Sequence, residues 1–345
     1  MSHRAQSRCG IMLFSTALEL TFLANQMELQ TKIPLTPSDN SIDYGSKLVL
    51  LGSCFVENIG AKLDYFRFQH LQNPFGILFH PLAIANLVER AIEEKAYRQE
   101  EIFEQDGIWH CFDAHSDLRS DDPEALLNLL NQQLDETKAG LETSSHIIIT
   151  LGTAWVYENN SSGKTVANCH KVPQKQFTKK LLSVAEIETS LQKMISLIQN
   201  VNPKAQIIFT ISPVRHLKDG FVENQRSKAN LITAVHSVLS SRAQSRDPPS
   251  FPSYEIMMDE LRDYRFYGKD MVHPNLLAVD YIWERFKSVW ISSKSYSVMD
   301  EVDAVQKGLQ HRPFNPDSEG HQKFKTSLRA KITYLQERFP FMKFE

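Results

Sequence analysis

Three short apolar runs constrain the fold of this 345-residue chain more than any other feature. The runs at 145–151 and 206–211 are apolar at consecutive positions, which is typical of strands buried on both faces of a parallel sheet. The run at 47–51 ends at Gly52 and leads directly into a helical pattern. Strands that alternate with helices along a chain indicate an α/β fold. We therefore expect a doubly wound, flavodoxin-like parallel sheet flanked by helices.

Local signals place further elements around these runs. Pro81 suits the first position of a helix, and Ser183 with Glu186 forms a capping box for another helix. Weak alternation at 64–69 predicts a second strand. The aromatic segment at 102–118 contains an Asp-Gly turn and predicts a small hairpin.

Both ends of the chain are expected to lie outside the main domain. Residues 1–26 have the outline of a signal peptide, but Glu19 interrupts the apolar stretch and no small-x-small cleavage site follows. We therefore interpret 1–26 as an N-terminal extension, with Met27 as the effective start. The main domain is expected at 27–295 and a C-terminal helical appendage at 296–345. No other segment is long and apolar enough to span a bilayer.

Composition excludes several classes of protein. The net charge of -3 argues against a nucleic-acid protein that binds through a basic surface. Four scattered cysteines without a Cys-x-x-Cys pair predict neither a disulfide framework nor a structural zinc site. A reducing, cytoplasmic location is the default prediction for such a chain.

Four polar motifs are expected to meet at one edge of the sheet. They are Gly52-Ser53-Cys54, Gly152-Thr153, Ser212-Pro-Val-Arg215-His216 and Asp270-x-x-His273. Ligands of open α/β sheets bind beyond the carboxyl ends of the strands, so these motifs are expected to line one cleft. Ser53 and Cys54 are two candidate nucleophiles, and His273 with Asp270 completes a triad. In it, His273 deprotonates the nucleophile and Asp270 orients the imidazole. The alternative for Asp270 and His273, a helix cap beside a surface histidine, accounts for less of the pattern.

Other polar segments have competing interpretations. Arg215 and His216 either bind an acidic group of a substrate or anchor their own loop. Residues 224–228 could add a basic lining to the cleft, but they are interpreted as a solvated helix start. Residues 168–171 are interpreted as a structural loop in preference to a metal site or a second nucleophile. We predict no metal ligand and no organic cofactor.

The motifs resemble a known family. Asp270-Met-Val-His-Pro-Asn275 is similar to the last block of the SGNH/GDSL hydrolase superfamily, and Gly-Ser-Cys-Phe resembles the signature of the GSCFA family, which is similar to those hydrolases. Segments such as Asn-Pro-Phe-Gly, Leu-Gly-Thr-Ala-Trp-Val-Tyr and Ser-Pro-Val-Arg-His also look like that family. The resemblance covers about residues 27–290 and implies an SGNH-type sheet.

The chain departs from the superfamily pattern at two blocks. Laid on the Gly-Asp-Ser block, Ser53 falls on the aspartate and Cys54 on the serine, so position favours Cys54 while superfamily chemistry favours Ser53. The asparagine that normally donates to the oxyanion is missing from the third block. Thr153, Gly76 and the Cys54 backbone N–H are therefore the candidate oxyanion donors, and Asn73 joins Arg215 and His216 as a candidate substrate contact.

The resemblance implies an ester hydrolase or acyltransferase that forms an acyl-enzyme and needs no cofactor. Its substrate is expected to be an O-acylated molecule such as a glycan, or a small ester. The departures motivate an alternative, a non-catalytic binding protein on the same fold. No nucleic-acid partner is predicted, and the oligomeric state is left open.

Overall fold

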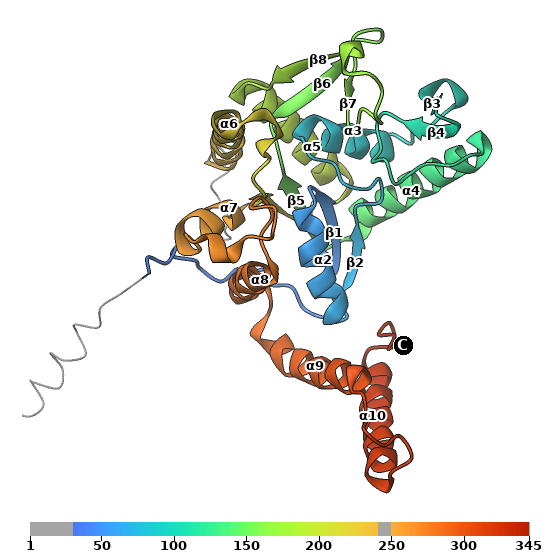
Figure 1. Ribbon diagram of the computed structural model, residues 1–345, viewed down its shortest axis with the longest axis vertical. Coiled ribbons are helices and arrows are strands. Elements are labelled where there is room, and N and C mark those ends of the chain that lie inside the picture. The colour runs from blue at the N-terminus through green and yellow to red at the C-terminus, as the bar shows by residue number, and fades with distance from the viewer. Residues whose placement is uncertain (1–29, 241–249, 345) are drawn as a thin grey trace, which may run out of the picture.

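The computed structural model describes residues 30–240 and 250–344, and its centre is a five-stranded parallel sheet (Figure 1). The strands are β1 (Lys47–Gly52), β2 (Gln69–Gln72), β5 (His146–Leu151), β9 (Gln206–Ile211) and β10 (Ser250–Phe251). They are arranged in the order β10-β9-β5-β1-β2, and every neighbouring pair is parallel. In chain order this is the 2-1-3-4-5 arrangement of flavodoxin-like sheets. The predicted doubly wound α/β fold is confirmed.

The register brings the ends of the three central strands to one edge of the sheet. Gly52 of β1 pairs with Thr150 of β5, and Leu151 of β5 pairs with Ile211 of β9. The order of the strands reverses between β1 and β5, because β2 lies on the other side of β1. Such a switch point leaves a crevice at the carboxyl edge where α/β proteins bind ligands.

Helices cover both faces of the sheet, which explains the consecutive apolar positions in its strands. One hydrophobic core joins Val49, Ile147 and Phe209 to α3 (Pro81–Ile92), α4 (Pro123–Thr143), α5 (Val184–Val201) and α6 (Phe221–Ser240). The other joins Leu50 and Ile148 to α2 (Phe55–Tyr65) and α8 (Leu276–Trp290). Alternate residues of one strand therefore enter opposite cores, and each buried aliphatic side chain contributes about 1.5–3 kcal/mol.

Smaller elements lie on the edges of this sandwich (Figure 1). The predicted hairpin is confirmed as β3 (Ile102–Gln105) and β4 (Ile108–Cys111). A second antiparallel sheet contains β6 (Trp155–Asn159), β7 (Thr165–Val166) and β8 (Phe177–Leu181). Short helical turns are α7 (Ser253–Glu255), Gln99–Glu101, Gln174–Gln176, Leu217–Asp219, Tyr264–Phe266, Ser293–Ser295 and a π-helical turn at Ile256–Glu260.

The C-terminal region consists of α9 (Tyr296–Gln310) and α10 (Glu319–Arg338), which project away from the sheet in Figure 1. The two helices approach closely at Gly308, where an added Cβ would meet Leu328 at 2.7 Å. The predicted helical appendage is thus present, while its boundary at 296 as a separate domain stays a prediction.

Three expectations about individual segments have different outcomes. The second strand is not at 64–69, because α2 continues to Tyr65 and buries Leu63 on its inner face, and the strand begins at Gln69. The capping box of Ser183 and Glu186 is confirmed at the start of α5. The N-terminal extension at 1–26 and the proposed start at Met27 lie outside the described residues.

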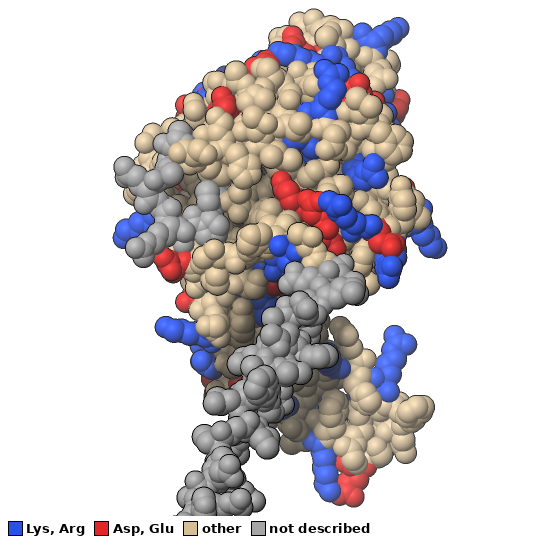
Figure 2. All heavy atoms as spheres, turned by 90° about the vertical axis from the view of Figure 1, so that its left-hand side faces the viewer, with Lys and Arg blue, Asp and Glu red and all other residues tan. Residues whose placement is uncertain are grey.

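Within 30–240 and 250–344, no helix is long and apolar enough to cross a membrane. On the face drawn in Figure 2, basic and acidic side chains are interspersed. The expected cytoplasmic location stays a prediction.

Candidate active site

The turn after β1 is built around Gly52, whose φ of 137° lies in a region that L-residues rarely adopt. A Cβ at this position would lie 2.1 Å from the Thr150 carbonyl oxygen. The Gly52 N–H donates to Asn73 Oδ1 at 2.9 Å, and the Ser53 N–H donates to Thr150 O at 3.0 Å. The backbone that presents Ser53 and Cys54 is therefore fixed by bonds to two neighbouring segments.

The two candidate nucleophiles differ in access. Ser53 is 0% exposed, and its buried Oγ has no hydrogen-bond partner among the described residues. Cys54 is half-buried and occupies the N-cap position of α2, although its side chain makes no capping hydrogen bond. Burial raises the pKa of the Cys54 thiol, while the charge of Lys228 and the N–H groups of Cys54 and Phe55 oppose that rise.

Asp270 and His273 form a close pair on the loop before α8. His273 Nδ1 lies 2.6 Å from Asp270 Oδ2, and Asp270 Oδ1 accepts the N–H groups of Val272 and His273 at 3.0 Å each. These backbone bonds, with the His273 ring, hold the pKa of Asp270 well below its usual range. Both side chains are about half exposed. With the Nδ1 proton held by Asp270, Nε2 is the nitrogen that can accept a proton.

Contacts with the segment after β9 connect this loop to the sheet edge. The Arg215 N–H donates to Val272 O at 3.2 Å. The next residue, His216, has its Nε2 3.2 Å from the point where a Cβ on Gly152 would lie, and Ser53 Cβ is 3.1 Å from the same point. In the described part of the chain His273 makes no hydrogen bond to Ser53 or Cys54, so closure of the triad stays a prediction.

His216 lies close to Gly152 at the carboxyl edge of the sheet. Its Nε2 is buried and has no hydrogen-bond partner among the described residues, and its backbone N–H donates to Asn224 Oδ1 at 2.9 Å. Burial, together with the charges of Lys228 and His273, lowers the pKa of His216 to about 3. The imidazole is therefore neutral at ordinary pH, and its contact with substrate stays a prediction.

Most of the other predicted polar groups already bind the protein itself. Gly76 N–H donates to Asn73 O at 2.7 Å, and Thr153 N–H donates to Phe79 O at 3.0 Å. In this conformation neither N–H is free to hold an oxyanion, so the Thr153 side chain and the Cys54 N–H stay the predicted donors. The Asn73 side chain accepts from Gly52 and donates to Glu57, so it fixes the turn, and its contact with substrate stays a prediction.

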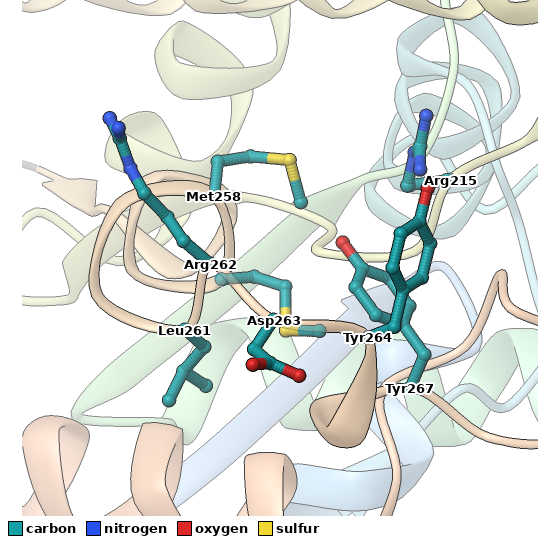
Figure 3. Close-up of a pocket in the computed structure, with 8 residues that line it drawn as sticks. Arg215, Met258, Leu261, Arg262, Asp263, Tyr264 and Tyr267 are labelled. Atoms are coloured by element: carbon teal, nitrogen blue, oxygen red, sulfur yellow. The ribbon is translucent and has the colours of Figure 1, made fainter.

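A pocket of about 160 Å³ lies between Arg215, on the segment after β9, and Tyr267, which precedes the loop of Asp270 and His273 (Figure 3). It is lined by Arg215, Met257, Met258, Leu261, Arg262, Asp263, Tyr264 and Tyr267. Figure 3 shows Arg215 on the same side as Tyr264 and Tyr267, with Arg262 opposite. Arg262 pairs with Asp259, whereas Arg215 forms no ion pair within the described residues. Its guanidinium lies 5.4 Å from the ring centre of Phe221.

Lys228 of α6 is a further polar group at this edge. It is 0% exposed, and its Nζ donates to Gly152 O at 2.8 Å and to Ser212 O at 2.7 Å. It therefore joins the segments that follow β5 and β9.

Two family models match this chain. The model of the GSCFA family matches residues 47–286, and that of the GSCFA domain protein, C-terminal domain, matches residues 302–345. The chain belongs to the GSCFA family. The suspected family membership is confirmed.

The likeness of this chain to solved structures is weak. The GSCFA chain is similar to an acetyl xylan esterase from the rumen bacterium Butyrivibrio proteoclasticus, with a TM-score of 0.38 and 12% identity over 81% of this chain and 66% of the esterase. A likeness of this size says nothing about the reaction. No curated protein matches the chain.

Lys228 is the residue of this GSCFA protein that sequence reasoning missed. The interpretation of 224–228 as a solvated helix start is wrong, because Asn224, Ser227 and Lys228 are all buried. Their spacing of three and four residues continues the buried stripe of α6 through Leu231. This helical periodicity indicates burial of these positions, but it is hard to recognise in the sequence because the side chains that carry it are polar.

The loop at 168–171 makes structural contacts. His170 Nε2 lies 2.7 Å from Cys111 O, and the His170 ring packs 4.7 Å from that of His110. No group of three His, Cys, Asp or Glu side chains is placed to hold a metal ion in the described part of the chain.

Proposed function

We propose that this GSCFA protein is an ester hydrolase or acyltransferase that forms an acyl-enzyme on Cys54. The observation that carries the proposal is the Asp270–His273 pair, at 2.6 Å, on a loop bonded to the same sheet edge that presents a half-exposed cysteine. An orienting carboxylate, an imidazole with one free nitrogen and a thiol on a helix N-terminus are the parts of a cysteine acyl-transfer site.

The chemistry uses these parts in two steps. His273 Nε2 accepts the Cys54 proton as the sulfur attacks the acyl carbon, and the C–O bond of the ester then breaks. The leaving alcohol takes the proton back from His273, and Asp270 stabilises the imidazolium in between. In the second step His273 deprotonates water or an acceptor alcohol, which attacks the thioester and releases the Cys54 thiol.

Access supports Cys54 over Ser53 as the nucleophile. Ser53 Oγ is fully enclosed behind Gly152, whereas Cys54 is partly open to solvent. A substrate could reach Ser53 only after the turn at Gly52 had moved, and that turn is fixed by bonds to Asn73 and Thr150.

The pocket beside the loop suggests what the substrate carries. Arg215 has no carboxylate partner in the described residues, and it shares the pocket with Tyr264 and Tyr267. A guanidinium between aromatic side chains suits a carboxylate on a ring-shaped group. We propose an O-acylated substrate, such as a sugar derivative, with an acidic group that Arg215 binds.

A non-catalytic binding protein is the second candidate. It is favoured by two observations: among the described residues His273 makes no hydrogen bond to Cys54, and the Gly76 and Thr153 N–H groups are held by Asn73 O and Phe79 O. Such a protein would use the same pocket without turnover. Catalytic hydrogen bonds often tighten only when substrate is bound, so the acyl-transfer proposal remains the stronger one.

An ester panel tests the proposal. Phenyl acetate and 4-acetoxybenzoate, which differ by one carboxylate, are compared on the wild type and on Cys54→Ala, Ser53→Ala and His273→Ala. We expect kcat/KM to fall at least about 10³-fold in Cys54→Ala and His273→Ala, with a smaller change in Ser53→Ala. Cys169→Ala, at another half-buried cysteine, is the matched control.

Two outcomes would contradict this account. Unchanged turnover in His273→Ala would refute the mechanism, and loss of turnover in Ser53→Ala alone would make Ser53 the nucleophile. Preference for 4-acetoxybenzoate that persists in Arg215→Gln would refute the proposed role of Arg215.

A further inference from the structure

A lysine without a carboxylate partner is buried at the candidate active site. Lys228 is 0% exposed and forms no ion pair in the described residues. Removing an ammonium from water is costly, and most proteins avoid it unless a neighbouring group compensates. Two carbonyl oxygens, those of Gly152 and Ser212, accept hydrogen bonds from Nζ.

The contacts of Lys228 place it next to the turn that carries the nucleophile. Gly152 lies against Ser53, whose Cβ is 3.1 Å from the Cβ position of Gly152, and Cys54 is the next residue. Ser212 follows the neighbouring strand β9 and donates its N–H to Leu151 O at 2.9 Å. The amine thus bridges the ends of two strands directly beside the end of the third.

The hydrogen bonds of Lys228 do not require it to be charged. An ammonium has three N–H donors and a neutral amine has two, so both forms can keep the bonds to Gly152 and Ser212. A purely structural bridge could use either form. The charged form adds a positive field at the turn of Ser53 and Cys54.

We propose that Lys228 is a positioning residue that acts through Cys54, since its buried ammonium stabilises the thiolate and so sets the reactivity of that thiol. The inference rests on the proposed function only for its use in catalysis, because thiol reactivity exists without a substrate. Lys228 itself does not touch the reacting atoms in this scheme.

The electrostatics of the two groups are reciprocal. Burial lowers the pKa of Lys228 to about 7, and Cys54 opposes that shift. Burial raises the pKa of the Cys54 thiol, and Lys228 is the first group that opposes that rise. Two groups coupled in this way titrate as a pair.

Other titratable groups face the pair from the surrounding elements. Glu57 of α2 acts against ionisation of Cys54, and Glu255 of α7 favours the charged form of Lys228. His216, on the segment after β9, is kept neutral in part by Lys228, and it also senses His273. The pH profile of Cys54 therefore has to be compared between variants rather than interpreted alone.

Alkylation of Cys54 tests the proposal in the full-length protein. The thiolate attacks iodoacetamide, an S–C bond forms and iodide leaves, and mass spectrometry follows the Cys54 peptide as a function of pH. We expect the midpoint of the rate profile to rise by about one unit or more in Lys228→Met and Lys228→Gln, which is about a tenfold lower rate at neutral pH. Arg226→Met removes an exposed cation from the same helix and should leave the profile unchanged.

An unchanged midpoint in folded Lys228 variants would overturn the proposal. If neither variant folds, the coupling is measured from the other side. The titration of ¹³C-labelled lysines is followed in the wild type and in Cys54→Ala, where the midpoint of Lys228 should fall. An unchanged lysine midpoint would also overturn the proposal.

These measurements separate this inference from the proposed function. A shifted alkylation profile in a protein that hydrolyses no ester would support the Lys228 inference and contradict only the enzymatic role. Ester turnover with an unshifted alkylation profile would support the enzymatic role and contradict the Lys228 inference.

Discussion

Cysteine and histidine gather at two places in this protein, and the two environments differ. The edge cluster contains Cys54, His216, His273 and Lys228 at the carboxyl ends of the central strands. The lobe cluster contains Cys111, His110 and His170, between the β3–β4 hairpin and the loop at 168–171. Residue type alone does not distinguish them.

Deep burial keeps the side chains of the lobe cluster neutral, although charged groups such as Asp113 and Arg90 lie near Cys111. It raises the pKa of Cys111 to about 12 and lowers the pKa of His170 to about 4, so both side chains are neutral at ordinary pH. His170 Nε2 also bonds to a carbonyl oxygen, and Cys111 is 1% exposed. Such a thiol is neither ionised nor accessible.

In the edge cluster, the candidate catalytic side chains are partly accessible to solvent and lie near charged groups. Cys54 is half-buried beside the Lys228 ammonium, and His273 is half-exposed beside the Asp270 carboxylate. The comparison predicts that a reactive cysteine needs an open path as well as a nearby cation, because Cys111 also lies near a cation, Arg90, but is closed to solvent. It predicts that changes at the edge alter rate and changes in the lobe alter stability.

The largest effect on catalytic rate is expected from a change at Asp270. Asp270→Asn should lower kcat by about 10²–10⁴-fold, because the amide cannot hold the His273 Nδ1 proton or stabilise the imidazolium. Thermal unfolding should change little, since both side chains are about half exposed. Asp280→Asn, at another half-exposed aspartate on the helix that follows this loop, is the matched control for kinetics.

A smaller effect is expected on the acid stability that the lobe cluster contributes. The pKa of His170 is lowered by burial to about 4, below its unfolded value of about 6.5, so the unfolded chain binds more protons between these values. The stability contributed by neutral His170 is fully present above about pH 6.5 and is lost as pH falls toward 4. By pH 5 the loss is on the order of 2 kcal/mol.

Denaturant unfolding at pH 7.5 and pH 5 measures this effect. His170→Gln should lose less stability on acidification than the wild type, whereas the exposed His311→Gln should lose the same amount. Equal acid losses in His170→Gln and the wild type would contradict the assignment of His170 as a buried neutral residue. Ester turnover at neutral pH should be unaffected in a folded His170 variant.

Sequence patterns predicted the parts of the fold that depend on local periodicity. The apolar runs at 145–151 and 206–211 became central strands, and the capping box of Ser183 starts α5. The strand predicted at 64–69 is wrong, because α2 extends to Tyr65 and the strand begins only at Gln69.

The candidate site was only partly visible in the sequence. The spacing of Asp270 and His273 predicted a contact that the structure shows at 2.6 Å. The engagement of Gly76 N–H by Asn73, and the burial of Lys228 under Gly152 and Ser212, depend on segments far apart in the chain. The first has no local signature, and the helical periodicity that includes Lys228 is carried by polar side chains, which resemble a solvated helix start until their neighbours in space are known.

Trapping of the acyl-enzyme tests the central claim most directly. The protein is mixed with excess 4-nitrophenyl acetate, quenched in acid within the first turnover, and the peptide that contains Ser53 and Cys54 is analysed by mass spectrometry. The account predicts an acetyl group on Cys54 that neutral hydroxylamine removes, as expected for a thioester, and that is absent from Cys54→Ala. An acetyl group on Ser53, or turnover that continues in Cys54→Ala, would contradict it.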